Sequence, residues 1–283
     1  MVDLPLVADA AYADAVVDAC RAEGMSAVLP LTDLDPVKLA EVAPALREIG
    51  TSVFVPDPRI ALGCQDKWEC HLMLQAAGLP SPPTWLPGTI DRTDLPYPML
   101  LKPRLGFAAR HIYRAADPDE LAFFERYSPL ESVYQQALDG TEFSIDCLGD
   151  LTGRAVGAIP RAMLQAKGGE QVKGETLDDP DLVELAVRCV EGLELRGPST
   201  VQCFRRDGVV QGVTDINTRF GGGFPLPLAA GGAYPELIIR MAAGEQPESR
   251  VGRHRPGVVM ARFLDEMILE RTPAGLRVVP DGR

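Results

Sequence analysis

The sequence predicts a fold of mixed α/β and α+β type, in which a short parallel α/β domain precedes a larger, mainly antiparallel part. Helix-then-strand units fill the first 65 residues, and such alternation is typical of a parallel sheet. After residue 131, apolar runs separated by short glycine-containing turns predict antiparallel strands. With 283 residues, 46% of them hydrophobic, the chain is long enough for two or three domains with their own cores.

The N-terminal region contains one amphipathic segment that ends at Gly24 and a second that begins at Asp35 and ends at Gly50. We expect a helix at 12–22, a strand at 27–29, a helix at 35–49 and a strand at 53–55. A parallel α/β domain usually opens with a strand, whereas this one opens with a helix. The sheet is therefore expected to lack its first strand.

One lysine lies at the predicted start of a helix and another at the predicted end of a strand. Asp66 resembles an N-cap with Glu69 three residues later, so a helix is expected to begin there with Lys67 in its first turn. A cation in that turn opposes the helix dipole, so Lys67 is either a surface residue or a phosphate ligand. Lys102 lies at the end of an apolar strand at 98–103, before a glycine turn, where a lysine can also bind a phosphate.

The remaining elements follow from caps, apolar runs and turns. We expect helices at 117–127, at 179–193 and within 225–243, strands at 112–113, 133–138, 142–148, 154–162 and 258–269, and a hairpin turn at 273–275. Residues 165–175 are polar and rich in glycine. They predict a loop, which either lies on the surface or lines a binding pocket.

The composition excludes several classes of function. A net charge of −12 argues against nucleic-acid and membrane partners, since both need a basic surface, and an anionic substrate would need a local basic pocket. No apolar run is long enough to span a membrane and no signal peptide is recognisable, so we expect a cytoplasmic protein. The six cysteines form no C-x-x-C pair and the three histidines lack ligand spacing, which argues against zinc or redox sites.

Residues 214–225 carry the strongest chemical signal. Asp215, Asn217 and Arg219 alternate, and side chains two apart on a strand share a face. Carboxylate and amide oxygens bind a hard cation such as Mg²⁺, while an arginine holds phosphate oxygens through its planar fork. The glycines at 221–223 follow directly and would let the backbone approach a ligand closely. The segment therefore predicts a metal and phosphate site.

The preceding residues predict a hairpin whose turn is Asp207-Gly208. A two-residue turn places Phe204 opposite Gln211 and Gln202 opposite Val213. Gln202 then shares a face with Asp215 as its diagonal neighbour. The alternative is a half-buried hairpin whose polar face is simply exposed to water.

Four segments in this order resemble the ATP-grasp superfamily, most closely the branch similar to the large subunit of carbamoyl-phosphate synthetase. The segments are DKWECHLMLQAAGLPSPPTW at 66–85, PMLLKPRLGFAARHI at 98–112, VYQQALDGTEFSID at 133–146 and TVQCFRRDGVVQGVTDINTRFGGGFPLPLAAGG at 200–232. The resemblance covers roughly residues 20–283. It implies an ATP-grasp fold with an N-terminal α/β domain at 1–65, a small subdomain at 66–131 and a large subdomain at 132–283.

The resemblance also implies an ADP-forming carboxylate-amine ligase, whose ATP phosphorylates a carboxylate that an amine then attacks. ATP and one or two Mg²⁺ ions are the implied cofactors, a carboxylic acid and an amine are the implied substrates, and a homodimer is left open. Carried over by motif, the nucleotide-binding residues are Lys67, Lys102, Gly106, Gln136, Ala137, Leu138 and Glu142. The implied metal ligands are Gln202, Asp215 and Asn217, and the implied catalytic residues are Arg219 and, on the acylphosphate side, Arg161.

The sequence departs from the family pattern at three places. Gln136 stands where the family usually has glutamate, and Asp215 is one methylene shorter than the usual glutamate. The loop at 106–111 has a single glycine, Gly106, where the family has small residues throughout. The alternative is therefore a nucleotide-binding protein with weak or lost catalysis. A kinase is a third reading, but the chain lacks both a G-x-x-x-x-G-K-[ST] loop and an H-R-D motif.

Overall fold

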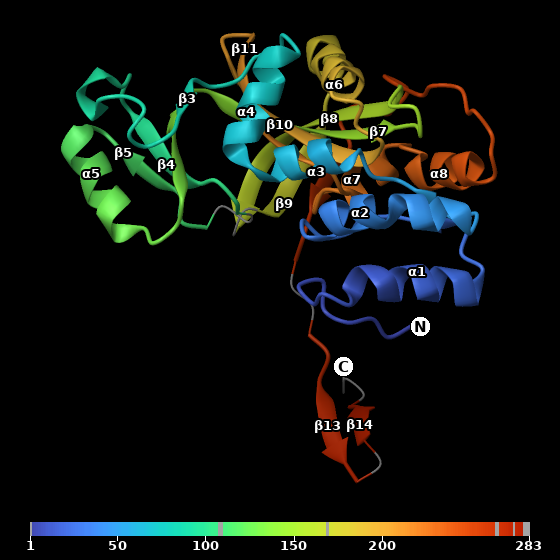
Figure 1. The fold of residues 1–283 in the computed structure, drawn as a ribbon. Coiled ribbons are helices and arrows are strands. Elements are labelled where there is room, and N and C mark those ends of the chain that lie inside the picture. The colour runs from blue at the N-terminus through green and yellow to red at the C-terminus, as the bar shows by residue number, and fades with distance from the viewer. Residues whose placement is uncertain (1, 107–109, 168–169, 264–265, 274, 280–283) are drawn as a thin grey trace.

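A computed structural model describes residues 2–106, 110–167, 170–263, 266–273 and 275–279 (Figure 1). The N-terminal region contains, in order, α1 (Tyr12–Glu23), β1 (Ala27–Val28), α2 (Asp35–Glu48), β2 (Ser52–Val53) and α3 (Pro58–Gln65). β1 and β2 pair in parallel, as the sequence predicts, and the described residues before α1 form no strand. Helix α1 ends where Gly24 adopts the left-handed conformation, with φ of 63°.

A small antiparallel sheet has the strand order β3-β6-β4-β5. Its strands are β3 (Thr84–Trp85), β4 (Met99–Pro103), β5 (Tyr113–Ala115) and β6 (Ser132–Gln136). Helix α5 (Pro118–Tyr127) covers one side, where Leu121 packs against Met99 and Leu101. A short 3₁₀ turn, Arg92–Asp94, precedes β4. Because β6 belongs to this sheet, we propose that the small subdomain ends at Gln136 and not at residue 131.

A larger antiparallel sheet has the strand order β11-β10-β7-β8-β9-β12. Its strands are β7 (Thr141–Gly149), β8 (Ala155–Lys167), β9 (Glu170–Thr176), β10 (Gly197–Arg206), β11 (Val209–Asn217) and β12 (Val259–Ala261). On one face Ile145 and Val201 share a core with α4 (Lys67–Ala76) and α6 (Pro180–Gly192). On the other face Leu148 and Val156 pack against α8 (Tyr234–Ala242), and α7 (Pro225–Ala229) precedes that helix. Helices therefore cover both faces of the large sheet.

Two predicted segments are wrong. Residues 165–167 and 170–175 belong to the paired strands β8 and β9 instead of a loop. Gln171 is buried there, and its side chain donates to the backbone oxygen of Ala162. The strand predicted at 258–269 is limited to β12, which pairs with β9 only from Val259 to Ala261. A separate hairpin follows, formed by β13 (Leu269–Thr272) and β14 (Gly275–Val278), and it projects away from the rest of the chain in Figure 1.

The β10–β11 hairpin turns at Asp207-Gly208 as predicted, with positive φ values of 50° and 81°. Its predicted register is wrong, because Phe204 pairs with Gly212 and Gln202 pairs directly with Asp215. Two register shifts cause the difference, and each adds one residue to β11. Since two shifts of one residue cancel, Gln202 and Asp215 still share a face. In the described part of the chain, no helix has the length and apolar character needed to cross a membrane.

Candidate active site

The predicted site residues gather where the first turn of α4, strand β4 and strand β11 meet. Nζ of Lys67 lies 3.6 Å from Oδ2 of Asp215 and donates to the backbone oxygen of Gly106 at 3.3 Å. Lys102 is buried nearby, with 6% of its surface exposed. The structure thus brings together two ammonium groups and one carboxylate that lie far apart in the sequence.

The position of Lys67 is fixed by the start of α4. The Asp66 carboxylate caps the helix by accepting from the backbone N–H groups of Trp68 and Glu69, as predicted. The guanidinium of Arg104 binds the same carboxylate, with Nε 3.1 Å and Nη2 2.5 Å from Oδ2. The backbone N–H of Lys67 also donates to the backbone oxygen of Arg104 at 2.9 Å. The segment that leads to Gly106 is therefore attached to the same turn that carries Lys67, and the sequence analysis missed Arg104.

Burial affects the pKa of Lys102. Its Nζ donates to Oε1 of Gln135 at 3.1 Å, and Gln135 in turn donates to Thr84 at 3.2 Å. Burial lowers the pKa of Lys102 below its ordinary value, while the nearby Asp215 carboxylate opposes that shift. An ammonium group with so little exposure to water interacts strongly with an anion that enters the site.

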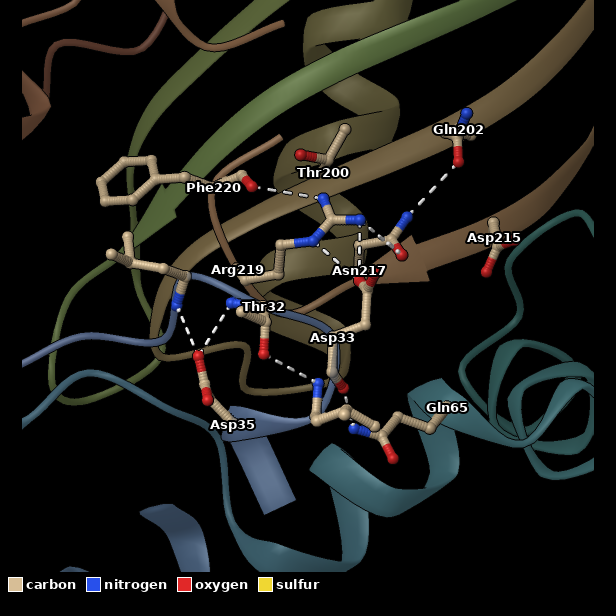
Figure 2. A network of polar contacts seen from close by, with 12 residues as sticks. Thr32, Asp33, Asp35, Gln65, Thr200, Gln202, Asp215, Asn217, Arg219 and Phe220 are labelled. Carbon is tan, nitrogen blue, oxygen red and sulfur yellow. Dashed lines mark hydrogen bonds and ion pairs between the residues drawn. The ribbon is translucent and has the colours of Figure 1, made fainter. Parts of the chain in front are cut away.

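A series of hydrogen bonds connects three strands on the same side of the sheet. Nε2 of Gln202 donates to Oε1 of Glu142 at 3.0 Å. Nδ2 of Asn217 donates to Oε1 of Gln202 at 3.3 Å (Figure 2). Burial raises the pKa of Glu142, and the nearby Lys102 ammonium opposes that shift. These hydrogen bonds therefore connect Glu142, the predicted ribose ligand, with Gln202 and Asn217, two of the predicted metal ligands.

Asp215, Asn217 and Gln202 offer the oxygen donors that Mg²⁺ prefers. Asp215 supplies the carboxylate, while the other two residues supply amide oxygens, and all three lie within one cross-strand group. The described residues include no cluster of three or more histidine, cysteine, aspartate or glutamate side chains suited to a metal. The donor set fits a Mg²⁺ ion that shares its shell with water and phosphate oxygens, and it carries little negative charge of its own.

Arg219 ends this series of hydrogen bonds and contacts the loop between β1 and α2 (Figure 2). Its Nη2 donates to Oδ1 of Asn217 at 3.3 Å, and its Nε donates to Oδ1 of Asp33 at 2.7 Å. Asp33 lies in the loop between β1 and α2, a position that the sequence analysis did not single out. No local pattern marks it, because the contact joins residues 186 positions apart.

Arg161 lies on β8, beside the strand that carries Glu142. It is 3% exposed, and its guanidinium donates to the Asp146 carboxylate at 2.5 Å and to Oε1 of Gln171. The glycines after β11 pack against it, since a Cβ on Gly223 would lie 2.6 Å from its Nη1 atom. These glycines permit a close approach of backbone to a buried ion pair, where the sequence suggested an approach to a ligand.

The predicted adenine-binding residues Gln136, Ala137 and Leu138 connect β6 to β7, and so join the two sheets. The backbone N–H of Gln136 donates to Pro83 at 2.9 Å, and that of Ala137 donates to Pro98 at 3.0 Å. Residues 107–109, half of the predicted phosphate loop at 106–111, lie outside the described part of the chain.

Comparisons with known proteins agree with this architecture. Residues 130–264 match the family described as ATP-grasp in the biosynthetic pathway with Ter operon. The biotin carboxylase domain of the Hydrogenobacter thermophilus 2-oxoglutarate carboxylase matches with a TM-score of 0.75 and 15% identity, over 100% of this chain and 73% of that one. The chain has the ATP-grasp fold. The predicted fold is thereby confirmed, and the match of residues 130–264 supports the predicted superfamily.

Two further structures have the same fold as this chain. Campylobacter jejuni biotin carboxylase matches with a TM-score of 0.69 and 18% identity, over 84% of this chain and 59% of that one. An L-amino acid ligase from Bacillus licheniformis matches with a TM-score of 0.68 and 21% identity, over 90% of this chain and 66% of that one. This chain therefore spans less than two thirds of both proteins. No curated protein sequence is similar enough to count as a relative.

Proposed function

We propose that this protein is an ATP- and Mg²⁺-dependent, ADP-forming ligase that activates a carboxylate as an acylphosphate for attack by an amine. The observation that carries the proposal is the group at the meeting of α4, β4 and β11. There Lys67 and Lys102 face the carboxylate of Asp215, and the two amides complete an oxygen donor set. Such a combination of cations and oxygen ligands suits a metal-bound triphosphate.

In this proposal each residue acts by position and charge. Lys67 and Lys102 hold phosphate oxygens, Glu142 accepts from ribose hydroxyl groups, and the backbone of 136–138 lies along the adenine. Gln202, Asp215 and Asn217 hold one or two Mg²⁺ ions, which when bound neutralise charge on the phosphates. Arg219 stabilises the phosphoryl group during transfer. No protein nucleophile is required, because the substrate carboxylate attacks the γ-phosphate directly.

The names of the similar structures support this direction. They include a biotin carboxylase domain in complex with MgADP and bicarbonate, and an L-amino acid ligase. Their identities to this chain are 15% and 21%, so the acid and the amine used here are open to experiment. The first of these names also describes a domain dimer, and a homodimer of the present chain stays a prediction that light scattering can check.

ADP release tests the proposal. The purified protein is supplied with Mg·ATP and a panel of carboxylic acids, with and without a panel of amines. We expect ADP release that depends on one acid and increases when an amine is added. Hydroxylamine in place of the amine should trap the acylphosphate as a hydroxamate. Binding of Mg·ATP without ADP release for any acid would contradict the ligase proposal.

The second candidate function is a nucleotide-binding protein with weak or lost catalysis. Such a protein would bind Mg·ATP without releasing ADP. Its supporting observation is the neutral Gln202, which pairs directly with Asp215 and leaves the metal group with a single carboxylate. Metal affinity depends on the number of charged ligands, so such a site holds Mg²⁺ weakly without the nucleotide.

Lys102→Met should weaken ATP binding by roughly ten- to a hundredfold and leave adenosine binding nearly unchanged, because it removes a charged hydrogen bond to phosphate and no contact to the ring. Methionine keeps most of the side-chain volume in this buried position. Calorimetry with both ligands measures the difference, and Lys38→Met on the surface of α2 is the control. Equal weakening of ATP and adenosine would argue against a phosphate contact.

A further inference from the structure

The N-terminal domain places a carboxylate directly on Arg219 (Figure 2). Oδ1 of Asp33 lies 2.7 Å from both Nε and Nη2 of the guanidinium. Both side chains remain partly open to solvent, with 27% of Asp33 and 18% of Arg219 exposed. The pair is therefore neutral as a unit, at the position where the proposed function needs a free positive charge.

All three nitrogen atoms of the Arg219 guanidinium already donate hydrogen bonds within the protein. Nη1 donates to the backbone oxygen of Phe220 at 3.2 Å, and Nη2 donates to Oδ1 of Asn217. A guanidinium holds a carboxylate or phosphate best through two parallel N–H groups. The Nε and Nη2 edge, which is suited to that geometry, is the edge that Asp33 occupies. An anion bound there has to displace Asp33.

The loop that carries Asp33 is held in place by contacts other than the ion pair. Oδ2 of the buried Asp35 accepts from the backbone N–H groups of Leu31 at 3.0 Å and Thr32 at 2.8 Å. Nε2 of Gln65 donates to the backbone oxygen of Asp33 at 2.5 Å. Since these contacts involve neither the Asp33 carboxylate nor Arg219, the carboxylate can rotate away while the loop keeps its conformation.

We propose that Asp33 is an internal counter-ion, which occupies Arg219 until an anionic group of the substrate or the transferred phosphoryl group displaces it. The inference rests on the proposed function only in taking Arg219 as the anion-binding group. Asp33 is thus a positioning residue that acts through Arg219, and it weakens anion binding by competition. An ion pair of this exposure changes a binding equilibrium by roughly two- to fivefold.

Inorganic phosphate is the probe, titrated in the presence of Mg·ADP and followed by phosphorus NMR. Asp33→Asn keeps a hydrogen-bond acceptor beside Arg219 but removes the charge, so phosphate should bind roughly two- to fivefold more tightly than to the wild type. Asp57→Asn is the matched control, because Asp57 forms another ion pair between the N-terminal region and a later part of the chain, 3.1 Å from Arg196 just before β10. It should leave phosphate affinity unchanged. A merely structural role for Asp33 predicts weaker binding, which is the opposite sign.

A measurement on the wild type covers the case in which Asp33→Asn does not fold. The side-chain carboxyl carbon resonance of Asp33 should shift when phosphate is added, and that of Asp57 should not. Unchanged or weaker phosphate binding in Asp33→Asn, or an unmoved Asp33 resonance during saturation, would overturn the inference. So would an absence of phosphate binding to both proteins. None of these readouts needs turnover, so failure of the ligase proposal would be seen separately, in the assay of ADP release.

Discussion

Replacing Asp215 and Asn217 together by alanine should lower Mg²⁺-dependent ADP release by roughly a hundredfold or more, while the protein stays folded. The double change removes the single carboxylate and one of the two amides of the donor set. It also leaves the ammonium group of Lys67 without the carboxylate that lies 3.6 Å away. Because Asp215 is partly exposed, we expect a cost in the free energy of unfolding of about 1 kcal/mol.

Steady-state assays across a range of Mg²⁺ concentrations, with thermal unfolding alongside, measure both effects. Gln211→Ala is the matched control, since its side chain lies on the same strand and donates to the backbone oxygen of Val209 instead of the metal group. Unchanged turnover in the double variant would remove the metal assignment.

Arg161→Met should destabilise the protein by about 3–5 kcal/mol, because it leaves the Asp146 carboxylate buried without its partner. The two side chains are 4% and 2% exposed and form a contact of 2.5 Å. We therefore propose a structural role for Arg161 in place of the catalytic role that the family resemblance implies. Urea unfolding measures the loss of stability.

A second change separates the two roles. Adding Asp146→Asn to Arg161→Met removes the unpaired charge, so most of the lost stability should return. A catalytic arginine would behave differently, since its replacement would abolish turnover and leave the free energy of unfolding nearly unchanged. That result would restore Arg161 to the active site.

Local signals in the sequence predicted much of the fold. Asp66 and Asp117 cap their helices through backbone N–H groups as expected, and the Asp207-Gly208 turn forms its hairpin. The predictions that were wrong are those that depend on how segments pack against each other. The segment at 165–175 looks like a loop because it is polar, but its described residues form strands in which Gln171 satisfies its hydrogen bonds inside the sheet. Helix α3 was missed because it is only eight residues long, from Pro58 to Gln65.

The candidate site was predictable where its residues follow a short pattern. Alternation along β11 and just past its end identified Asp215, Asn217 and Arg219, which do share one group with Gln202. Asp33 carries no such pattern, since only the docking of the N-terminal domain brings it to Arg219. The burial of Arg161 was also not predictable from the sequence. A sequence shows that Arg161 is charged, but not that a neighbouring strand supplies Asp146 as its partner.

The two register shifts in β11 have a consequence for how this hairpin can change in length. Each shift is one extra residue in β11, so deleting that residue would remove the bulge and leave Ile216 in the core and Asp215 and Asn217 on the face of the site. Deleting a residue where the pairing is regular would instead reverse the faces of the strand beyond it. Related chains should therefore lose single residues between the turn and the metal group at these two places.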